Sequence, residues 1–346
     1  MTASRRPIHC SILFIATAAA VTLLFFAMLT SGHVRIPVVD VAAILCGGVP
    51  EVEAWRAIIL ESRLPMAITA LLSGACLGVA GLLLQTVFRN PLAGPSILGI
   101  SSGASLGVAL VMLAVAAIPA IPAGMLTFGA FIGAMAGAAV ILLILSVFST
   151  ILRNTLSLLI VGIMVSYIAS AVISILNVLA PAEAVRSFVV WGLGSYAGVA
   201  ITDVPVFAAV SAVLLIPTVL CAKPLNAMLL GDRYLRTMGY RVNTIRTLIM
   251  TIAGVLTAVV TAYCGPIGFI GLIVPHVARM IYDTSNHFIL IPATILTGAV
   301  VSLLCAWISV LPITSGVLPI NAVTPIAGVP VILYIILNTK RLKYFN

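Results

Sequence analysis

The sequence predicts an all-α, polytopic membrane protein with about ten transmembrane helices in a single membrane domain over residues 1–346. Of its residues, 62% are hydrophobic and only 7% are charged, a balance that no soluble domain has. Apolar runs long enough to cross the hydrocarbon core recur along the chain as one continuous block. Basic residues gather in alternate segments between these runs, as expected of loops that face the cytoplasm.

The first five expected spans lie in the N-terminal half. An apolar run follows Arg5 and Arg6. It resembles a signal peptide, but it is long enough to span and no clear small-residue cleavage site follows it, so we assign it as the first span. The second span opens at Arg63 and ends before a Pro-rich break at Arg89-Asn90-Pro91. The five are expected at about 11–31, 62–87, 95–116, 121–148 and 155–179.

The last five expected spans are divided by two unusual segments. A basic segment, residues 223–246, separates the sixth span from the seventh, and a Gly/Pro-rich stretch opens the eighth at Gly265. Pro inside or beside an apolar run marks a helix end or a kink. The five are expected at about 200–222, 242–263, 266–282, 288–311 and 320–339.

The distribution of charge fixes the expected orientation, with both termini cytoplasmic. An even number of spans places 13 of the 17 Lys and Arg residues on the inner side, and an odd number would move the C-terminal Lys340, Arg341 and Lys343 outside. Six of the eight acidic residues fall on the outer side. The four outer basic residues are Arg35, Arg56, Arg63 and Arg186.

Residues 223–246 are the most charged inner segment. Leu225, Met228, Leu235 and Met238 recur at roughly helical spacing with charged residues between them, and Gly239 is a plausible helix stop. The pattern indicates a short amphipathic helix that lies across the inner face and meets a soluble partner. A solvated basic loop explains the same composition.

Small residues recur every four positions in several spans. Such faces let helix backbones approach closely in a membrane, where no hydrophobic effect drives helix association, so we expect them to pack helices. They are Gly74 and Gly78; Gly99, Gly103 and Gly107; and Gly129, Gly133 and Gly137.

Two Gly/Pro-rich segments, 89–95 and 265–271, each follow a regular span and open an interrupted one. Paired interruptions of this kind suggest an internal repeat whose irregular backbone lines a pathway. Simple turns between spans are the alternative.

Several classes of function lack their motifs. No Gly-rich phosphate loop exists because none of the three lysines follows a glycine, so ATP-driven transport needs an ATPase on another subunit. No cofactor, metal or catalytic site is expected: the four His are dispersed, and we interpret the six Cys as packing residues. Scattered basic residues do not favour nucleic acid. No charged residue falls at the middle of an expected span, which argues against ion-coupled transport.

Five strings resemble one family. They are Arg63-Leu64-Pro65, GACLGVAGLLLQTVFRNPLAGPSILGISSGA (74–104), LLGDRYLRTMGYRV (229–242), GPIGFIGLIVPHVARM (265–280) and VTPIAGVPVILYII (323–336). In colinear order from about residue 56 onward, they resemble the FecCD family, the permeases of type II ABC importers for iron-siderophores, haem and vitamin B12. The resemblance implies a homodimer in the bacterial inner membrane, two cytoplasmic ABC ATPase subunits and an extracytoplasmic substrate-binding protein.

The resemblance also implies roles for individual residues. Gly231, Asp232, Arg236 and Gly239 match the family's ATPase-coupling motif, and residues 226–240 would form coupling helices. Asn90 and Leu92 match positions near the cytoplasmic gate of the translocation path, and Thr155 is a further match there. Arg56 and Arg63 would meet the binding protein, although Met66 stands where the family often has a second arginine, and the stretch Leu318–Asn321 lacks the family's acid and glycine.

The sequence therefore predicts the permease subunit of an ATP-driven importer for an iron chelate, haem or cobalamin. A self-sufficient secondary transporter or channel is the alternative, and it would need an ion site that the sequence does not reveal. An intramembrane enzyme would need convergent polar side chains at depth. Which cargo is carried is not encoded in these motifs.

Overall fold

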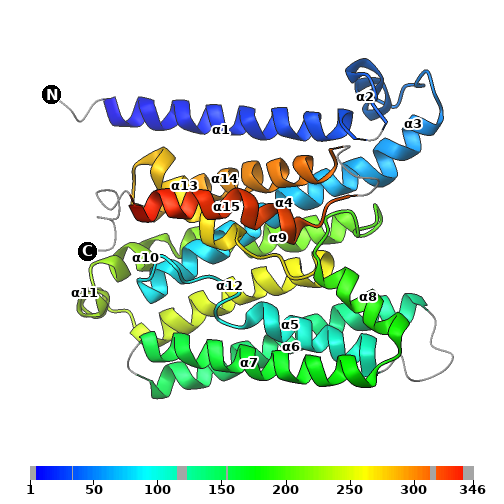
Figure 1. Ribbon diagram of the computed structural model, residues 1–346. Helices are drawn as coiled ribbons and strands as arrows, with labels where there is room; N and C mark the ends of the chain where they lie inside the picture. The colour runs from blue at the N-terminus through cyan, green and yellow to red at the C-terminus, as the bar shows by residue number, and fades with distance from the viewer. Residues whose placement is uncertain (1–4, 33, 115–122, 153–154, 312–316, 338–346) are drawn as a thin grey trace.

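A computed structural model describes residues 5–32, 34–114, 123–152, 155–311 and 317–337, and these residues form helices and loops without a β-strand. The long helices run roughly along one common direction (Figure 1). The all-α prediction is confirmed for this part of the chain. A helical bundle suits a lipid environment because each helix satisfies its own backbone hydrogen bonds.

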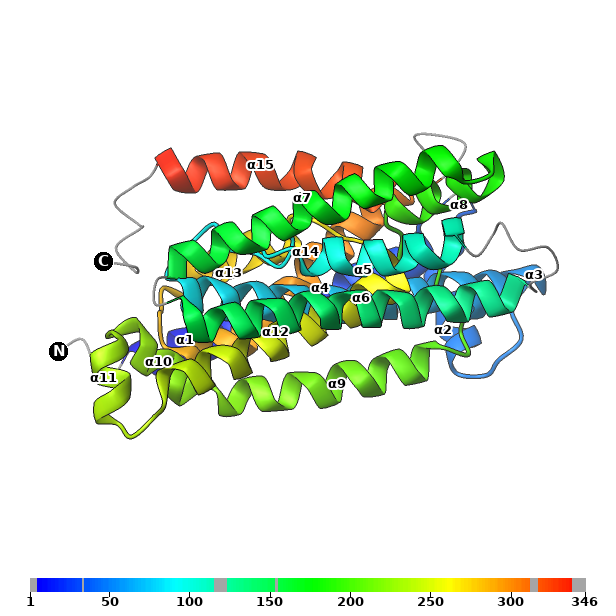
Figure 2. The ribbon, with the colours of Figure 1, turned by 90° about the horizontal axis from the view of Figure 1, so that it is seen from below.

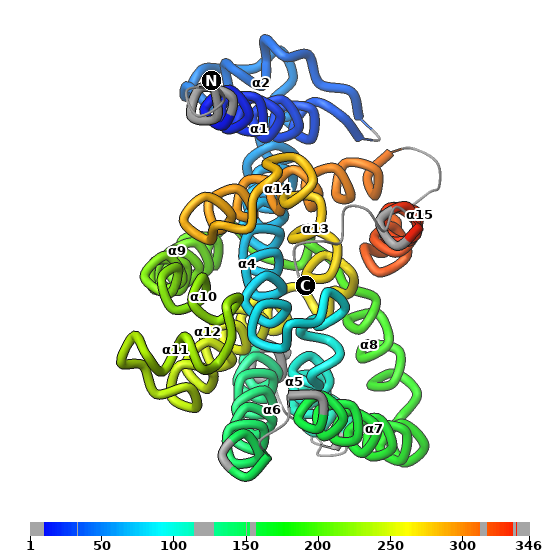
Figure 3. The backbone as a smooth tube through the Cα atoms, turned by 90° about the vertical axis from the view of Figure 1, so that its left-hand side faces the viewer, coloured from blue at the N-terminus to red at the C-terminus, as the bar shows by residue number. Residues whose placement is uncertain are grey.

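The central helix of the bundle is α4, Leu64–Phe88. It continues from α3, Ala54–Ala57, through a π-helical turn, η1, Ile58–Arg63. Seen along the bundle, α4 lies at its centre, with other helices on all sides (Figure 3). Its neighbours include α9, Val204–Leu220, α12, Val242–Cys264, α13, Ile270–Tyr282, and α14, His287–Ser309. The most apolar window of the 54–88 run is 83% buried, which explains why α4 is apolar on every face rather than amphipathic.

The remaining long helices surround this centre. α1 packs mainly on α14, while α5 packs against α6, α7 and α12. α15 packs on α13 and α14, and Figure 2 shows it at the edge of the bundle opposite α9. Their bounds are α1, Arg5–Thr30; α5, Ile100–Ala109, extended by the π-helical turn η2, Leu110–Ala114; α6, Ala123–Ile151; α7, Thr155–Leu179; and α15, Ile320–Leu337.

Several glycines at four-residue spacing lie at close helix contacts, as predicted. A Cβ on Gly74 would lie 2.2 Å from the carbonyl oxygen of Gly298 in α14, and one on Gly107 would lie 1.8 Å from that of Gly133 in α6. Gly137 approaches the Gly103 backbone equally closely. These faces admit no side chain because backbone meets backbone.

The number of spans can be compared with the prediction of ten. Among the described residues, six helices are long and apolar enough to cross a membrane, and the pair α9 and α10, bent by 50°, makes a seventh candidate. Three shorter apolar helices, Ile100–Leu113, Ile270–Tyr282 and Ile320–Tyr334, stand at three further expected positions. The chain is thus a multi-pass membrane protein, and the count of ten stays a prediction.

Short helices cap the two ends of the bundle. α2, Val38–Leu45, α3 and α8, Ala182–Gly192, lie at one end. α10, Ala222–Leu229, and α11, Asp232–Thr237, lie at the other, together with the beginning of α1 and the end of α15 (Figure 1). Neither α2 nor α8 was predicted from the sequence, because both are much shorter than a membrane span.

Candidate coupling and gate site

The charged segment 223–246 forms the short helices α10 and α11 and the start of α12, rather than the single helix that its spacing predicts. We refer to α10 and α11 as the coupling helices, after the role that the resemblance implies. Gly231 separates α10 from α11 with a φ of 111°, a backbone conformation that L-residues with side chains rarely adopt. Gly239, with a φ of 84°, follows the last turn of α11, so the predicted helix stop is confirmed. Leu225, Met228 and Leu235 are buried against the bundle, as the amphipathic pattern predicts.

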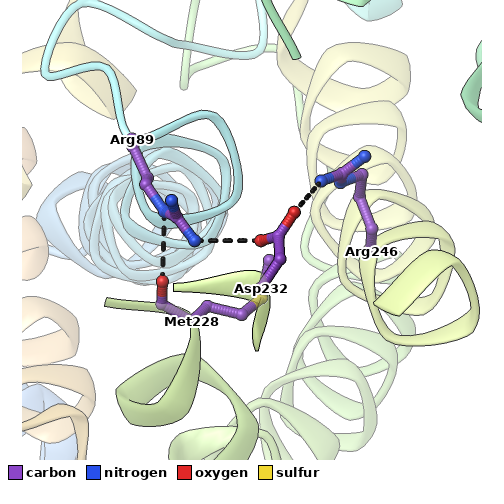
Figure 4. Close-up of polar contacts among 4 residues, drawn as sticks. All are labelled: Arg89, Met228, Asp232 and Arg246. Carbon is purple, nitrogen blue, oxygen red and sulfur yellow. Dashed lines mark hydrogen bonds and ion pairs between the residues drawn. The ribbon is translucent and has the colours of Figure 1, made fainter. Parts of the chain in front are cut away.

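Asp232, the first residue of α11, is held between two arginines from other helices (Figure 4). Arg89 donates to Asp232 Oδ1 at 2.9 Å, and Arg246 of α12 donates to Oδ2 at 3.3 Å. The Arg89 Nε–H also donates to the carbonyl of Met228 in α10, at 3.1 Å. The carboxylate therefore joins α11 to the end of α4 and to the beginning of α12, and Arg89 joins α10 to α4.

The three charged groups differ in exposure. The Arg246 side chain is only 5% exposed, whereas those of Arg89 and Asp232 are 43% and 40% exposed. Within the described residues, Arg246 Nε is a buried donor with no hydrogen-bond partner. Asp232 thus provides the nearby negative charge that a buried guanidinium requires.

Arg236 and Gly239 lie on the outer side of the coupling segment. Arg236 is exposed, and the described part of the chain gives its side chain no ion pair. Three apolar side chains of the same segment, Leu230, Tyr234 and Met238, are also exposed, by 68%, 46% and 46%. The exposed surface of this segment therefore combines positive charge with apolar area and is available to a partner.

The loop after α4, residues 89–95, which we term the gate loop, is ordered by its own polar groups. Asn90 Oδ1 accepts from the backbone N–H of Leu92 at 2.9 Å, which closes a tight turn. The Pro91 carbonyl accepts from the ring Nε2–H of His276 in α13 at 2.8 Å. Leu92 itself is 47% exposed. Thr155 begins α7, and its side chain lies outside the described residues.

A further polar network, which was not predicted from the sequence, links α10, α14 and α4. Asn226 Oδ1 of α10 accepts from the backbone N–H and the ring Nδ1–H of His287, and His287 Nε2 meets the Thr86 hydroxyl of α4 at 2.9 Å. Next to Thr86 in α4, Gln85 accepts at Oε1 from Arg279 of α13, at 2.8 Å. The only available signal was the presence of polar residues at span ends, which does not specify their partners.

At the opposite end of the bundle, the two predicted docking arginines are in different situations. Arg56 in α3 is exposed. Arg63 is half-buried, and its guanidinium donates to the backbone carbonyl of Leu29, at 2.7 Å, and to that of Val34. A Cβ on Gly32 would lie 3.0 Å from Arg63 Nη2. Arg63 therefore connects the end of α1, and the residues that follow it, to the start of α4.

We expect Arg63→Gln to lower the free energy of unfolding by about 1–3 kcal/mol, because two carbonyls lose a charged donor. Thermal unfolding of the detergent-solubilised protein measures this loss. Arg56→Gln is the matched control and should leave the unfolding midpoint within error, since exposed substitutions rarely change stability. Equal thermal unfolding midpoints for the two variants would show that the Arg63 hydrogen bonds do not stabilise the protein.

The two interrupted segments meet in space. Residues 94–97 and 267–272 line a shared cavity of about 250 Å³. Asn321 at the start of α15 holds the second segment, because its amide accepts from the N–H of Gly268 at 3.0 Å and donates to the carbonyls of Gly192 and Pro266. The adjacent open cavity, of about 530 Å³, has a largely apolar lining that includes Ile173, Phe188 and Phe269. Its polar lining residues are Ser96, Ser101, Ser102, Ser105, Ser170 and Asn321.

Comparison with protein families matches residues 20–338 to the model of the FecCD transport family. The vitamin B12 import system permease protein of Salmonella schwarzengrund is 33% identical over 283 residues, which cover 81% of this chain and 84% of the relative. The protein of the same description from Citrobacter koseri is 34% identical over 283 residues, covering 81% of this chain and 83% of the relative.

A solved structure described as a metal-chelate type ABC transporter in an inward-facing conformation superposes on this chain with a TM-score of 0.82. The two chains share 28% sequence identity over 95% of this chain and 99% of the other. The similarity therefore extends over nearly the whole chain.

Proposed function

Because the chain belongs to the FecCD transport family, and is thus an ABC importer permease rather than a catalytic subunit, we propose that it moves an iron chelate, haem or cobalamin across the bacterial inner membrane. An extracytoplasmic binding protein delivers the cargo, and two cytoplasmic ATPase subunits drive transport. Gly231, Asp232, Arg236 and Gly239 act at the ATPase contact. Asn90, Leu92 and Thr155 act at the cytoplasmic gate.

The observation that carries this proposal is the pair α10 and α11 at one end of the bundle. Leu225 and Met228 anchor α10, while Arg236, Tyr234 and Met238 face outward on α11. A basic and partly apolar helix surface suits a groove on a soluble protein. In this proposal the end that carries α11 is cytoplasmic, and the beginning of α1 and the end of α15 share it (Figure 1).

A second copy of the chain completes the path. The open cavity includes Ser101, Ser102 and Ser105 among apolar side chains, and a hydroxyl that faces hydrocarbon without a hydrogen-bond partner is unfavourable. Covering it with the same surface of a second copy encloses a pathway that carries no fixed charge. Such a path suits a bulky amphiphilic cargo, because strong binding within it would slow release.

The binding protein docks at the end that carries α2, α3 and α8. Arg56 is exposed there beside the exposed acids Glu51 and Glu53, so the surface carries both signs of charge. The guanidinium of Arg63 donates to two backbone carbonyls. In this proposal Arg63 therefore holds the docking surface in place and also contributes positive charge to it.

We expect reconstituted vesicles that contain the chain and its co-expressed ATPase to take up radiolabelled cobalamin, haem or a ferric siderophore when a matching binding protein is outside. Uptake should require ATP, the ATPase and the binding protein, and the active label identifies the cargo. Vesicles without the ATPase are the matched control. Uptake by the chain alone under a proton or sodium gradient would replace the proposal with a secondary transporter.

A further inference from the structure

The last turn of α4 and the gate loop receive polar contacts from three other parts of the bundle. Arg89 reaches the coupling helices, Thr86 reaches His287 of α14, and Pro91 reaches His276 of α13. A second, indirect connection runs from Asn226 of α10 to His287 of α14, and from His287 to Thr86 of α4. One direct and one indirect connection restrict rotation of α10 and α11 relative to the end of α4.

Arg89 occupies a backbone conformation that disfavours its own side chain. It terminates α4 with a φ of 44° and a ψ of 37°, in the left-handed region where helix ends usually place glycine. A residue with a Cβ there is held by its surroundings rather than by its intrinsic preference. The guanidinium contacts with Met228 and Asp232 are the described interactions that a glycine would lack.

These contacts are poorly suited to stabilising the fold alone. The Arg89–Asp232 pair is about two-fifths exposed on each side, and ion pairs so exposed contribute little to stability. The contacts nevertheless define geometry, because Arg89 donates to both coupling helices at once, one acceptor in α10 and one in α11. Asp232 is in turn fixed to α12 through the buried Arg246.

We infer that Arg89 is a positioning residue that transmits displacement of the coupling helices to the gate loop. It is the residue immediately before Asn90, so any shift of Asp232 or Met228 acts on the loop with no intervening flexible segment. This inference rests on the proposed function, because the displacement comes from the ATPase. The inference assigns two separate roles. Arg236 contacts the ATPase, and Arg89 transmits the displacement of the coupling helices to the gate loop.

Arg89→Gly tests the inference, because glycine keeps the left-handed backbone and removes only the side chain. The reporter is a spin label at Leu92→Cys in both copies of the reconstituted permease–ATPase complex. Cys10 and Cys46, which are not buried, are replaced by Ser so that the label reports one site. Pulsed electron paramagnetic resonance measures the distance between the two labels with and without ATP plus vanadate.

We expect the parent complex to change this distance on nucleotide trapping and Arg89→Gly to reduce the change at least twofold. ATPase binding and ATP hydrolysis should stay within twofold of the parent, since the outer face of α11 is intact. A purely structural role for Arg89 would leave the nucleotide-driven change unaltered. If Arg89→Gly does not fold, Arg89→Gln replaces it, because it keeps much of the side chain and removes the charge.

Asp283→Gly is the matched control, because Asp283 ends α13 with the same φ of 44° and a ψ of 46°. It should keep the full distance change. An undiminished change in Arg89→Gly or Arg89→Gln, loss of ATPase binding in either, or an equal reduction in Asp283→Gly would overturn the inference. Failure of the parent to bind any ATPase would instead refute the proposed function.

Discussion

Reversing the charge at Asp232 is expected to abolish coupled transport and also to destabilise the protein. Asp232→Lys places a third positive charge beside Arg89 and the buried Arg246. Removing one partner of a buried ion pair costs about 3–5 kcal/mol, and the partial exposure of Asp232 places this case near the lower end. The unfolding midpoint and ATP-dependent uptake should both fall.

Arg236→Glu tests the proposed contact with the ATPase separately from the internal ion pairs of Asp232. Arg236 is exposed, so its reversal should leave the unfolding midpoint nearly unchanged. Uptake should nevertheless fall at least tenfold, which corresponds to about 1.4 kcal/mol of coupling free energy. Uptake at the parent level in Arg236→Glu would exclude it from the ATPase contact. An unchanged midpoint in Asp232→Lys would show that Arg246 does not depend on Asp232.

The second large effect is expected at the contact between α5 and α6. In Gly107→Val, the new Cβ would lie 1.8 Å from the carbonyl oxygen of Gly133, and no rotamer relieves a clash with backbone. Overpacking a core costs about 1–3 kcal/mol, and a backbone clash exceeds that range because the two helices must separate. We expect little folded protein after solubilisation, measured as the monodisperse fraction in size-exclusion chromatography.

Gly198→Val is the control for Gly107→Val, because a Cβ on Gly198 meets no atom within 4 Å. It should give the parent's yield. A normal yield and unfolding midpoint for Gly107→Val would mean that α5 and α6 pack less closely than the structure indicates. Such a result would also weaken the proposed path, because Ser101, Ser102 and Ser105 reach the cavity from the same helix.

The features predicted from sequence are those with a local physical cause. Gly103 and Gly107 recur at the spacing of one helix face, so a close contact could be expected before its partner was known. Gly239 ends α11 because glycine accepts a positive φ. The apolar run 64–88 predicts a span from its length, and its uniform apolarity accords with the burial of α4.

The features that could not be predicted depend on contacts distant in the chain. Arg89 and Asp232 are 143 residues apart, and neither position reveals its partner. Arg63 was expected to face the binding protein, but its described partners are backbone carbonyls, which every residue carries and no sequence pattern marks. The split at Gly231 was missed because the apolar spacing continues across it.

The central place of α4 has a consequence for how the protein is made. Ser73 of α4 contacts Cys264, which is 191 residues later in the chain, and the glycine face of α4 packs on α14, later still. At ribosomal rates of about 5–20 residues per second, α4 waits roughly 10–40 s for these neighbours. α5 and α6, in contrast, are consecutive helices and can pair as soon as both are inserted. Synthesis therefore leaves the least amphipathic helix without its later neighbours for tens of seconds, and lipid or a membrane chaperone must surround it until the C-terminal helices arrive.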